Sequence, residues 1–304
     1  MISLGNISIS TIRSGKGDCI HIRFIGSSGI PHNIIIDSGP SSAAGEFRKL
    51  LTDILSQSES LDMLLITHYD DDHIGGILKV GDLGFQEVYF NAYDGEEETG
   101  NLSATQAQQL FITLPSAKVH GRIVRGDVIE LDGAKITVIA PSQENLSGAM
   151  EKMKDVQLAA VSDWNNTLDE LMGKQYPSCD SSVSNRASVV FIFEFGSVRL
   201  LFCGDAPDDS ILDGLEKRSH FDLVKLPHHG SIRNISEKLL DMIDVDTFLI
   251  CADGTSHPNK QTIAKLLKHY KAVTVYSNYN WWMNGFLKPE DFKYIDRGLN
   301  FKLI

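Results

Sequence analysis

The pattern of apolar and polar residues predicts short strands in both halves of the chain, with helices between them. Apolar and polar residues alternate over residues 7–12 and 19–25, and residues 33–37 form a nearly continuous apolar run that ends in Asp37. Alternation with a period of two is typical of strands with one buried face. We therefore expect the first part of the chain to form an antiparallel meander.

At the predicted helices, apolar residues recur every three or four positions rather than at every second position. Phe47, Leu50, Leu51 and Ile54 fall on one helical face. Similar patterns predict helices at residues 106–114, 208–217, 236–242 and 260–270. Strands are predicted at residues 63–66, 87–91, 188–195, 198–203, 223–226, 247–252 and 273–276, with a hairpin over 127–140 that turns at Asp132 and Gly133.

Residues 142–184 differ from the rest of the chain. Apolar residues recur there at helical spacing among Asn, Ser, Asp and Lys. We predict a mostly helical insertion, which is long for a connection and which we interpret as a lid. No repeat or low-complexity linker interrupts the sequence. We therefore expect residues 1–304 to form a single α/β domain with two sheets.

Composition narrows the possible functions. Lys and Arg total 28 and Asp and Glu total 40, which gives a net charge of −12. A chain this acidic lacks the basic surface that holds duplex DNA non-specifically. The four cysteines form no CxxC pair, and no apolar run approaches the length of a membrane span. We expect a cytoplasmic protein with no membrane contact.

The densest group of candidate ligands follows the predicted strand at 63–66. Within six residues stand His68, Asp70, Asp71, Asp72 and His73, and Gly75 and Gly76 come after them. Side chains at i and i+2 of an extended segment point the same way, so we expect His68, Asp70 and Asp72 to converge. His73 would join them if the chain turns at the two glycines. Imidazole and carboxylate ligands together favour Zn²⁺, Mn²⁺ or Fe, and a solvated acidic loop is the alternative.

This segment resembles the HxHxDH motif of the metallo-β-lactamase fold. It is closer to the HxDxDHxGG variant in the metallo-β-lactamase-like domain of ComEC/Rec2 DNA-uptake proteins. Other segments agree with that family in order: residues 15–19 with its GQGDS turn, 36–39 with its Asp-x-Gly, 185–190 with its NNxSLV, 203–206 with its TGDA, 226–231 with its HHGS and 256–259, in part, with its GHPH. Together these motifs span nearly the whole chain.

The resemblance implies an αββα sandwich with a dinuclear metal site between the sheet edges. Carried over by position, the implied ligands are His68 and Asp70 for one metal, Asp72, His73 and His228 for the second, and Asp205 as the bridge between them. His229 would be either a ligand or a proton donor and phosphate contact beside the site. Asp37 would orient the ligand loop from behind.

The chain departs from the family pattern at two positions. Asp70 stands where most members have histidine, and Asn185 stands about where the third histidine of the first site would fall. Oxygen donors in place of nitrogen donors favour Mn²⁺ over Zn²⁺, or leave only one metal bound. We therefore expect one or two divalent ions, Zn²⁺ or Mn²⁺.

These ligands suit the hydrolysis of phosphodiesters. Two cations that share a water lower its pKa and neutralise a phosphate under attack. We predict a phosphodiesterase or nuclease that acts on single-stranded nucleic acid or nucleotides. Asp72, His229 and His257 are the predicted catalytic residues, and His257 would donate to a phosphate oxygen or to the leaving group. Asn185 and Ser231 are candidate substrate contacts.

Two other functions remain open on the sequence. The fold hosts many chemistries, so the substrate could instead be a small ester, thioester, lactone or lactam. The protein could also be non-catalytic and stabilised by its metal, with the insertion at 142–184 binding a partner protein.

Overall fold

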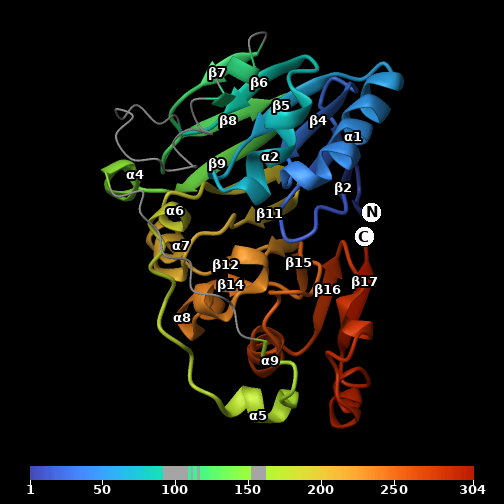
Figure 1. The fold of residues 1–304 in the computed structure, drawn as a ribbon, viewed down its shortest axis with the longest axis vertical. Helices are drawn as coiled ribbons and strands as arrows, with labels where there is room; N and C mark the ends of the chain where they lie inside the picture. Colours follow the sequence, from blue (N-terminus) through green and yellow to red (C-terminus); the bar gives the residue numbers. More distant parts are fainter. Residues whose placement is uncertain (92–108, 111, 115–116, 152–161) are drawn as a thin grey trace.

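Two β-sheets packed face to face form the centre of the molecule, with helices on their outer surfaces (Figure 1). The structure is a computed structural model, and it describes residues 1–91, 109–110, 112–114, 117–151 and 162–304. The expected αββα sandwich is confirmed. The helix expected at 106–114 lies largely outside the described residues.

The first sheet comes from the N-terminal part of the chain. Its seven strands lie in chain order: β1 (Ile2–Leu4), β2 (Ile7–Thr11), β3 (Ile20–Ile25), β4 (Pro31–Ile36), β5 (Leu61–Leu65), β6 (Phe85–Tyr89) and β7 (Lys118–His120). β1 to β4 pair antiparallel, as the meander predicted, whereas β4 to β7 pair parallel. Parallel pairing requires crossovers, and α1 (Ala44–Ser56) and α2 (Asp71–Val80) supply two of them. α2 was not predicted.

The second sheet comes from the remainder of the chain. Its eight strands lie in the order β17 (Leu299–Leu303), β16 (Val273–Ser277), β15 (Thr247–Ile250), β13 (Leu223–Lys225), β11 (Val198–Phe202), β10 (Val190–Phe195), β9 (Ala134–Ala140) and β8 (Val128–Leu131). The crossover helices are α7 (Asp208–Gly214), α8 (Glu237–Met242) and α9 (Lys260–His269), and β12 (Ser219–His220) and β14 (Ile243–Asp244) form a separate small sheet. β17 was not predicted.

Three apolar cores hold these layers together. The central one lies between the sheets and takes alternate residues of each strand, such as Ile20, Ile22 and Phe24 of β3. α1 and α2 cover the outer face of the first sheet, and Phe47 and Leu51 are buried there. A third core lies between the second sheet and its helices. Figure 1 shows the two helical layers on different parts of the molecule, α1 and α2 above and α8 and α9 below.

The insertion at 142–184 contains helices in its described part. α4 (Gln143–Glu151) begins it, α5 (Leu168–Gly173) follows, and α6 (Val183–Arg186) starts at its end. Residues after 161 are anchored to the second helical layer: Asp163 accepts from the backbone N–H of Lys260 at 2.7 Å, and Trp164 Nε1 donates to the Pro258 carbonyl at 3.0 Å. A lid role for the insertion stays a prediction. Within the described ranges, no helix is both long and apolar enough to cross a membrane.

The topology brings the candidate site residues to one edge of the sandwich. Asp37 follows β4, His68 follows β5, Asp205 follows β11, and the His228–His229 pair follows β13. These strands run parallel to a neighbour in their sheet. Loops after the carboxyl ends of parallel strands meet at the same edge, where α/β proteins bind ligands.

Gly75 and Gly76 do not form the predicted turn, because they lie inside α2. A Cβ on Gly76 would overlap the carbonyl oxygen of Ser38, and one on Gly75 would overlap the backbone N of Ser41. The Gly76 N–H donates to the Gly39 carbonyl at 2.8 Å. The two glycines therefore let α2, which carries Asp72 and His73, pack directly on the backbone that follows β4.

Gly76→Ala is expected to destabilise the protein by about 1–3 kcal/mol, because the added methyl must push α2 away from Ser38. The matched control is Gly45→Ala in α1, where a Cβ meets nothing within 4 Å. Alanine is the better helix former, so that change is expected to be neutral or stabilising by up to about 1 kcal/mol. Urea unfolding measures both, and equal effects would contradict the close approach of α2.

Candidate metal centre

The carboxylate of Asp205 is the meeting point of the candidate ligands. Its Oδ2 lies 3.3 Å from His229 Nε2, 3.5 Å from His73 Nε2 and 3.9 Å from His228 Nε2. Asp205 is buried. A buried carboxylate that faces three imidazole rings could help to hold a cation, and the bridging role of Asp205 stays a prediction.

Among the described residues, four overlapping groups of potential ligand atoms lie at this site, and the atoms of each group lie within 4.8 Å of one another. Two of them, which we call the ligand groups, are His68, His73 and Asp205, and Asp72, His73 and His229. The other two include the Asp18 carboxylate: Asp18, Asp37 and His73, and Asp18, Asp205 and His229. Asp70 lies just outside, with Oδ2 3.7 Å from His68 Nε2. The sequence divided the histidines differently, with His68 at one metal and His73 at the other, whereas the geometry places His73 in both ligand groups.

The first turn of α2, rather than an extended segment, brings Asp72 and His73 into the site. Asp70 is the residue before the helix, with φ −66° and ψ 144°, and Asp71 to His73 are helical. The argument from alternate residues of a strand was therefore wrong for Asp72. Acidic side chains in a first helical turn are favoured by the positive end of the helix dipole.

Residues behind the site fix the orientation of the rings. Asp37 accepts from the Thr67 N–H at 2.7 Å and pairs with His73 Nδ1 at 2.8 Å. His229 Nδ1 donates to the Cys251 carbonyl at 3.0 Å. In both rings Nδ1 is occupied, which leaves Nε2 to face the cluster, as in metal-binding histidines. Asp37 thus orients the ligand loop as the sequence predicted.

The buried donor atoms fit a divalent cation. Nε2 of His68, His73 and His229 is buried and has no hydrogen-bond partner among the described residues. Burial by itself lowers the pKa of His73 and of His229, yet surrounding carboxylates, Asp205 foremost, raise both well above 6.5. The cluster therefore has a negative potential that attracts positive charge. Imidazole and carboxylate donors of this kind suit Zn²⁺ or Mn²⁺.

Lys225 is a site residue that the sequence analysis missed. Its ammonium group is buried, pairs with Asp18, donates to the Gly204 carbonyl at 3.0 Å and lies 3.7 Å from Asp205 Oδ1. Burial raises the pKa of Asp18, but Lys225 and His229 overcome it and lower that pKa to about 2. Lys225 is the last residue of β13, and nothing in its apolar surroundings distinguished it from an ordinary strand residue.

Asp180 is a second missed residue. Its Oδ2 accepts from Asn185 Nδ2 at 2.6 Å and from Asn234 Nδ2 at 3.1 Å, and it lies 3.2 Å from His228 Nδ1. Asp180 thereby orients His228, which is more exposed than His229 and outside both ligand groups. The geometry favours His229 over His228 as the ligand that joins Asp72 and His73.

The two adjacent histidines have an unusual backbone. His228 and His229 have φ of 45° and 53°, and Gly230 follows with φ 84°. Non-glycine residues in this region cost about 1–3 kcal/mol each and persist only where surrounding contacts enforce them. Two in succession turn the rings to different sides, His229 into the cluster and His228 toward Asp180.

The remaining predicted residues are placed as follows. His257 lies beside the site, and its ring centroid is 5.1 Å from that of His228. Its pKa is lowered to about 3, mainly by burial and secondly by the positive charges of His228 and His229. Asn185 is buried and engaged by Asp180, and the Ser231 Oγ accepts from the Arg233 N–H at 3.3 Å. Substrate contacts by Asn185 and Ser231 stay predictions.

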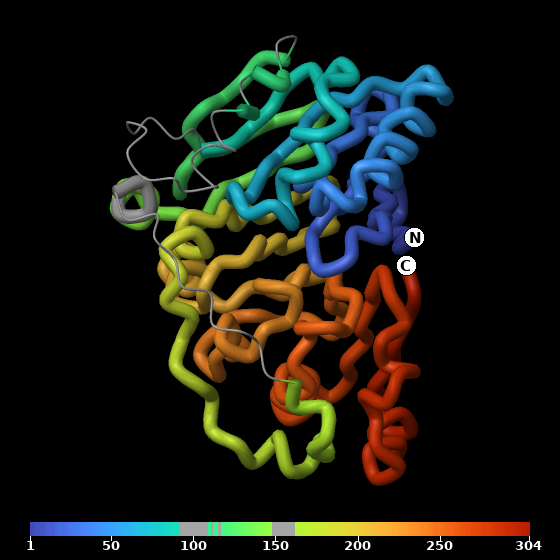
Figure 2. Tube along the Cα trace, in the orientation of Figure 1, coloured from blue at the N-terminus to red at the C-terminus, as the bar shows by residue number. Residues whose placement is uncertain are grey.

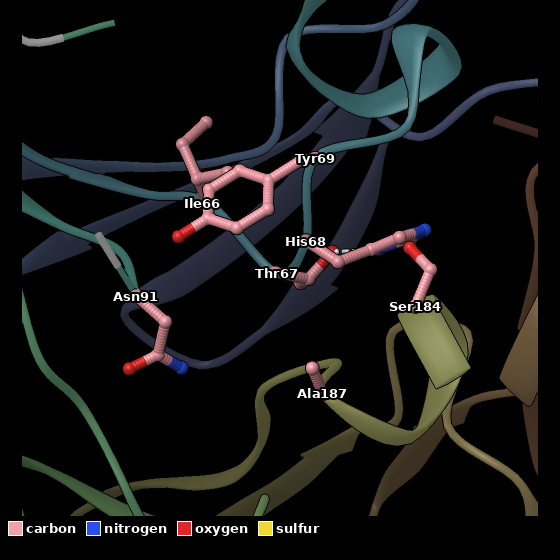
Figure 3. A pocket seen from close by; sticks show the side chains of 7 residues that line it. All are labelled: Ile66, Thr67, His68, Tyr69, Asn91, Ser184 and Ala187. Carbon is pink, nitrogen blue, oxygen red and sulfur yellow. Dashed lines mark hydrogen bonds between the residues drawn. The ribbon is translucent and has the colours of Figure 1, made fainter. Parts of the chain in front are cut away.

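A small cavity of ≈ 10 Å³ flanks His68. It has room for about one water molecule. Figure 3 shows the His68 side chain extending toward Ser184 of α6, with Tyr69 and Asn91 on the other side of the cavity. The Ser184 hydroxyl donates to Asp70 Oδ1 at 3.0 Å. This bond holds the Asp70 carboxylate, the residue that replaces a histidine, at the edge of the cluster.

Part of the chain is similar to a known protein family. Residues 32–150 match the model of the metallo-beta-lactamase superfamily. The matched part contains Asp37 and the ligand segment 68–73. Comparison with curated protein sequences gave no match. The resemblance to the ComEC/Rec2 domain stays a prediction.

Several solved structures are similar. Zn²⁺-bound PqqB from Methylobacterium extorquens is 12% identical with a TM-score of 0.46, over 94% of this chain and 85% of that one. The metallo-beta-lactamase fold protein YhfI from Bacillus subtilis is 12% identical with a TM-score of 0.45, over 97% and 96%. The metallo-beta-lactamase MIM-1 from Novosphingobium pentaromativorans is 16% identical with a TM-score of 0.37, over 72% and 75%.

His229→Gln is expected to weaken divalent-ion binding by at least about tenfold, because it removes a buried nitrogen of the cluster. His228→Gln, one residue away, is the matched control and is expected to cost less. Titration calorimetry of metal-stripped protein with Mn²⁺ and with Zn²⁺ measures both. A larger loss in the His228 variant would show that the assignment of the ligand is reversed.

Lys225→Met is expected to reduce the free energy of unfolding by about 3–5 kcal/mol, since it leaves the buried Asp18 carboxylate without its cation. The double variant Asp18→Asn/Lys225→Met removes both charges and is expected to lose clearly less. Urea unfolding of the metal-stripped proteins gives the comparison. If the double variant is the less stable of the two, Lys225 is not the counter-charge of Asp18.

Proposed function

We propose that this protein is a metal-dependent hydrolase that cleaves phosphodiesters, with single-stranded nucleic acid or nucleotides as substrates. The observation that carries the proposal is the chemistry of the cluster. Buried, unbonded imidazole nitrogens face carboxylates that outnumber the nearby cations. The superfamily match over residues 32–150 supports a metal-dependent hydrolase. The choice of a phosphodiester rests on the donor set and on the ComEC/Rec2-like motifs.

A phosphodiester suits a carboxylate-rich site better than a neutral ester or lactam does. The proposed ligands include Asp72 and Asp205, with Asp70 at the edge, where nitrogen donors would leave more positive charge on the ions. When bound, one or two divalent ions would supply a water of lowered pKa and the positive charge that a phosphate under attack requires. The transition state of phosphodiester cleavage gains the most from that charge because it carries the most negative charge itself.

The residues of this chain have distinct roles in the proposal. Asp72 is 36% exposed, so its carboxylate borders the mouth of the site and can accept a hydrogen bond from the attacking water. His229, fixed by Cys251, holds Nε2 toward the reacting region. His257 has a buried Nδ1 without a described partner and lies beside His228. We assign it a hydrogen bond to a phosphate oxygen or to the leaving group.

The net charge of −12 narrows the substrate further. Long duplex DNA carries a dense line of charge that an acidic protein repels over most of its surface. A flexible single strand or a nucleotide can present one phosphate to the cluster and leave the rest in solvent. We therefore favour small or single-stranded substrates.

A non-catalytic, metal-stabilised protein that binds a partner through the insertion at 142–184 is the second candidate. The specific observation that favours it is Asn185, which stands where a ligand histidine is expected and is engaged by Asp180 instead. A structural metal would contribute to folding, so removal of a ligand would then unfold the protein.

Asp72→Asn is expected to reduce metal-dependent cleavage of end-labelled single-stranded DNA by at least about a hundredfold, while the fold is retained. The measurement titrates metal-stripped protein separately with Mn²⁺ and Zn²⁺ and compares product lengths. Asp71→Asn is the matched control, because Asp71 lies in the same helical turn but is exposed and outside the ligand groups. It is expected to retain activity.

Thermal unfolding of the same variants separates the two candidates. An enzyme loses turnover in Asp72→Asn with little change in melting temperature, whereas a structural metal site loses stability. If the unaltered protein cleaves the DNA with neither metal, the proposed nuclease activity on DNA is contradicted. That result would move the assignment to nucleotide-sized substrates or to partner binding.

A further inference from the structure

We infer that the turn of residues 13–17, in which Arg13 and Lys16 are exposed, is a binding site for the substrate backbone. There Arg13 and Lys16 contact phosphates that flank the scissile one. This inference rests on the proposed function and specifies its substrate. It assigns the turn to a single strand with phosphates on both sides of the cleaved bond, rather than to a lone nucleotide.

The turn forms one wall of the candidate site. The Asp18 N–H donates to the Asp72 carbonyl at 3.2 Å, and a Cβ on Gly17 would overlap that same carbonyl oxygen. The glycine therefore allows the turn to touch the backbone of Asp72, whose side chain borders the mouth of the site. Ser14 closes the turn, since its Oγ donates to the Gly17 carbonyl at 2.5 Å.

The second sheet fixes the turn from the other side. The Gly15 N–H donates to the Tyr279 hydroxyl at 3.0 Å, and Asn278 Nδ2 donates to the Ile12 carbonyl at 3.0 Å. Both partners follow β16 directly. Figure 2 shows the N-terminal turn, in blue, next to the orange and red C-terminal segments. Hydrogen bonds to both halves of the sandwich therefore hold the turn beside the site.

The turn carries two cations that no described carboxylate pairs with. Arg13 and Lys16 are exposed, and no ion pair involves either within the described part of the chain. The Arg13 guanidinium lies 5.8 Å from the centre of the Tyr279 ring. Two unpaired cations beside a carboxylate cluster, in a chain with excess negative charge, form a local site for anions.

Other arginines near the site are already engaged. Arg186 donates to both carboxylate oxygens of Asp209, at 3.1 and 2.8 Å, and Arg233 donates to the Cys179 carbonyl at 3.5 Å. Binding phosphate would require these side chains to give up their present partners. Among the residues that the structure describes, Arg13 would give up only its contact with the face of the Tyr279 ring, and Lys16 would give up no ion pair.

Salt dependence provides a test that does not require turnover. The logarithm of the binding constant K falls as the logarithm of the salt concentration rises, and each phosphate contact on a single strand makes this slope steeper by about 0.7. The double variant Arg13→Ala/Lys16→Ala is therefore expected to make that slope shallower by about 1.4 and to weaken binding roughly tenfold at low salt. The probe is a fluorescent phosphorothioate oligothymidine, followed by anisotropy with the metal-loaded protein. Phosphorothioates keep the charge and resist cleavage.

The matched control is Lys268→Ala/Lys271→Ala, which removes the same charge from exposed positions at the end of α9. That variant is expected to show the same salt dependence of binding as the unaltered protein. Equal effects of the two double variants would overturn the inference, because only overall charge would then matter. An unchanged slope in the Arg13/Lys16 variant would also overturn it.

Cleavage of the unmodified oligonucleotide separates this inference from the proposed function. If the unaltered protein cleaves DNA but the Arg13/Lys16 variant binds with the original slope, the proposed hydrolase function is supported and phosphate binding by the turn is contradicted. If the slope falls as expected but no protein cleaves DNA, the turn binds backbone phosphates and the proposed nuclease fails.

Discussion

The burial of Asp205 between imidazole rings and an ammonium group is the constraint on which the rest of the site depends. A buried carboxylate is costly unless positive charge or hydrogen bonds compensate it. Here Lys225 approaches one oxygen at 3.7 Å, and His229 and His73 approach the other at 3.3 and 3.5 Å. His73 lies in α2, which packs on the first sheet, whereas Lys225 ends β13 of the second sheet and His229 follows it, so the sandwich must close before the charges can compensate one another.

The same constraint connects the site to parts of the chain that are distant in sequence. Lys225 also pairs with Asp18, which continues the turn that carries Arg13 and Lys16. His229 reaches Asp205 only because its backbone adopts a positive φ, and Cys251 and Asp18 hold its Nδ1. Backbone strain at the His228–His229 pair is therefore maintained by the contacts that make the cluster, as is typical of functional sites.

Charge is divided unevenly between the centre of the site and its rim. The centre has more carboxylates than cations, which suits metal ions, and the rim has Arg13 and Lys16, which suit an anionic chain. Under the proposed function, bound divalent ions and these two side chains would supply the positive charge that a phosphodiester meets in a protein with a net charge of −12. Both features suit a substrate that approaches as a flexible strand.

The sequence by itself indicated many of the strands and helices, though not α2 or β17, and it indicated the candidate metal segment. Periodicity located β2 to β5 and α1, and the density of ligands at 68–73 marked the candidate metal segment. Only the tertiary structure decided which side chains meet. Gly75 and Gly76 indicate a turn locally, but they lie inside α2, where they pack closely on the backbone of Ser38 and Ser41. Lys225 is recognised as a site residue only from the tertiary structure, in which it pairs with Asp18. Side-chain direction and burial depend on contacts between distant residues, and no local pattern records those contacts.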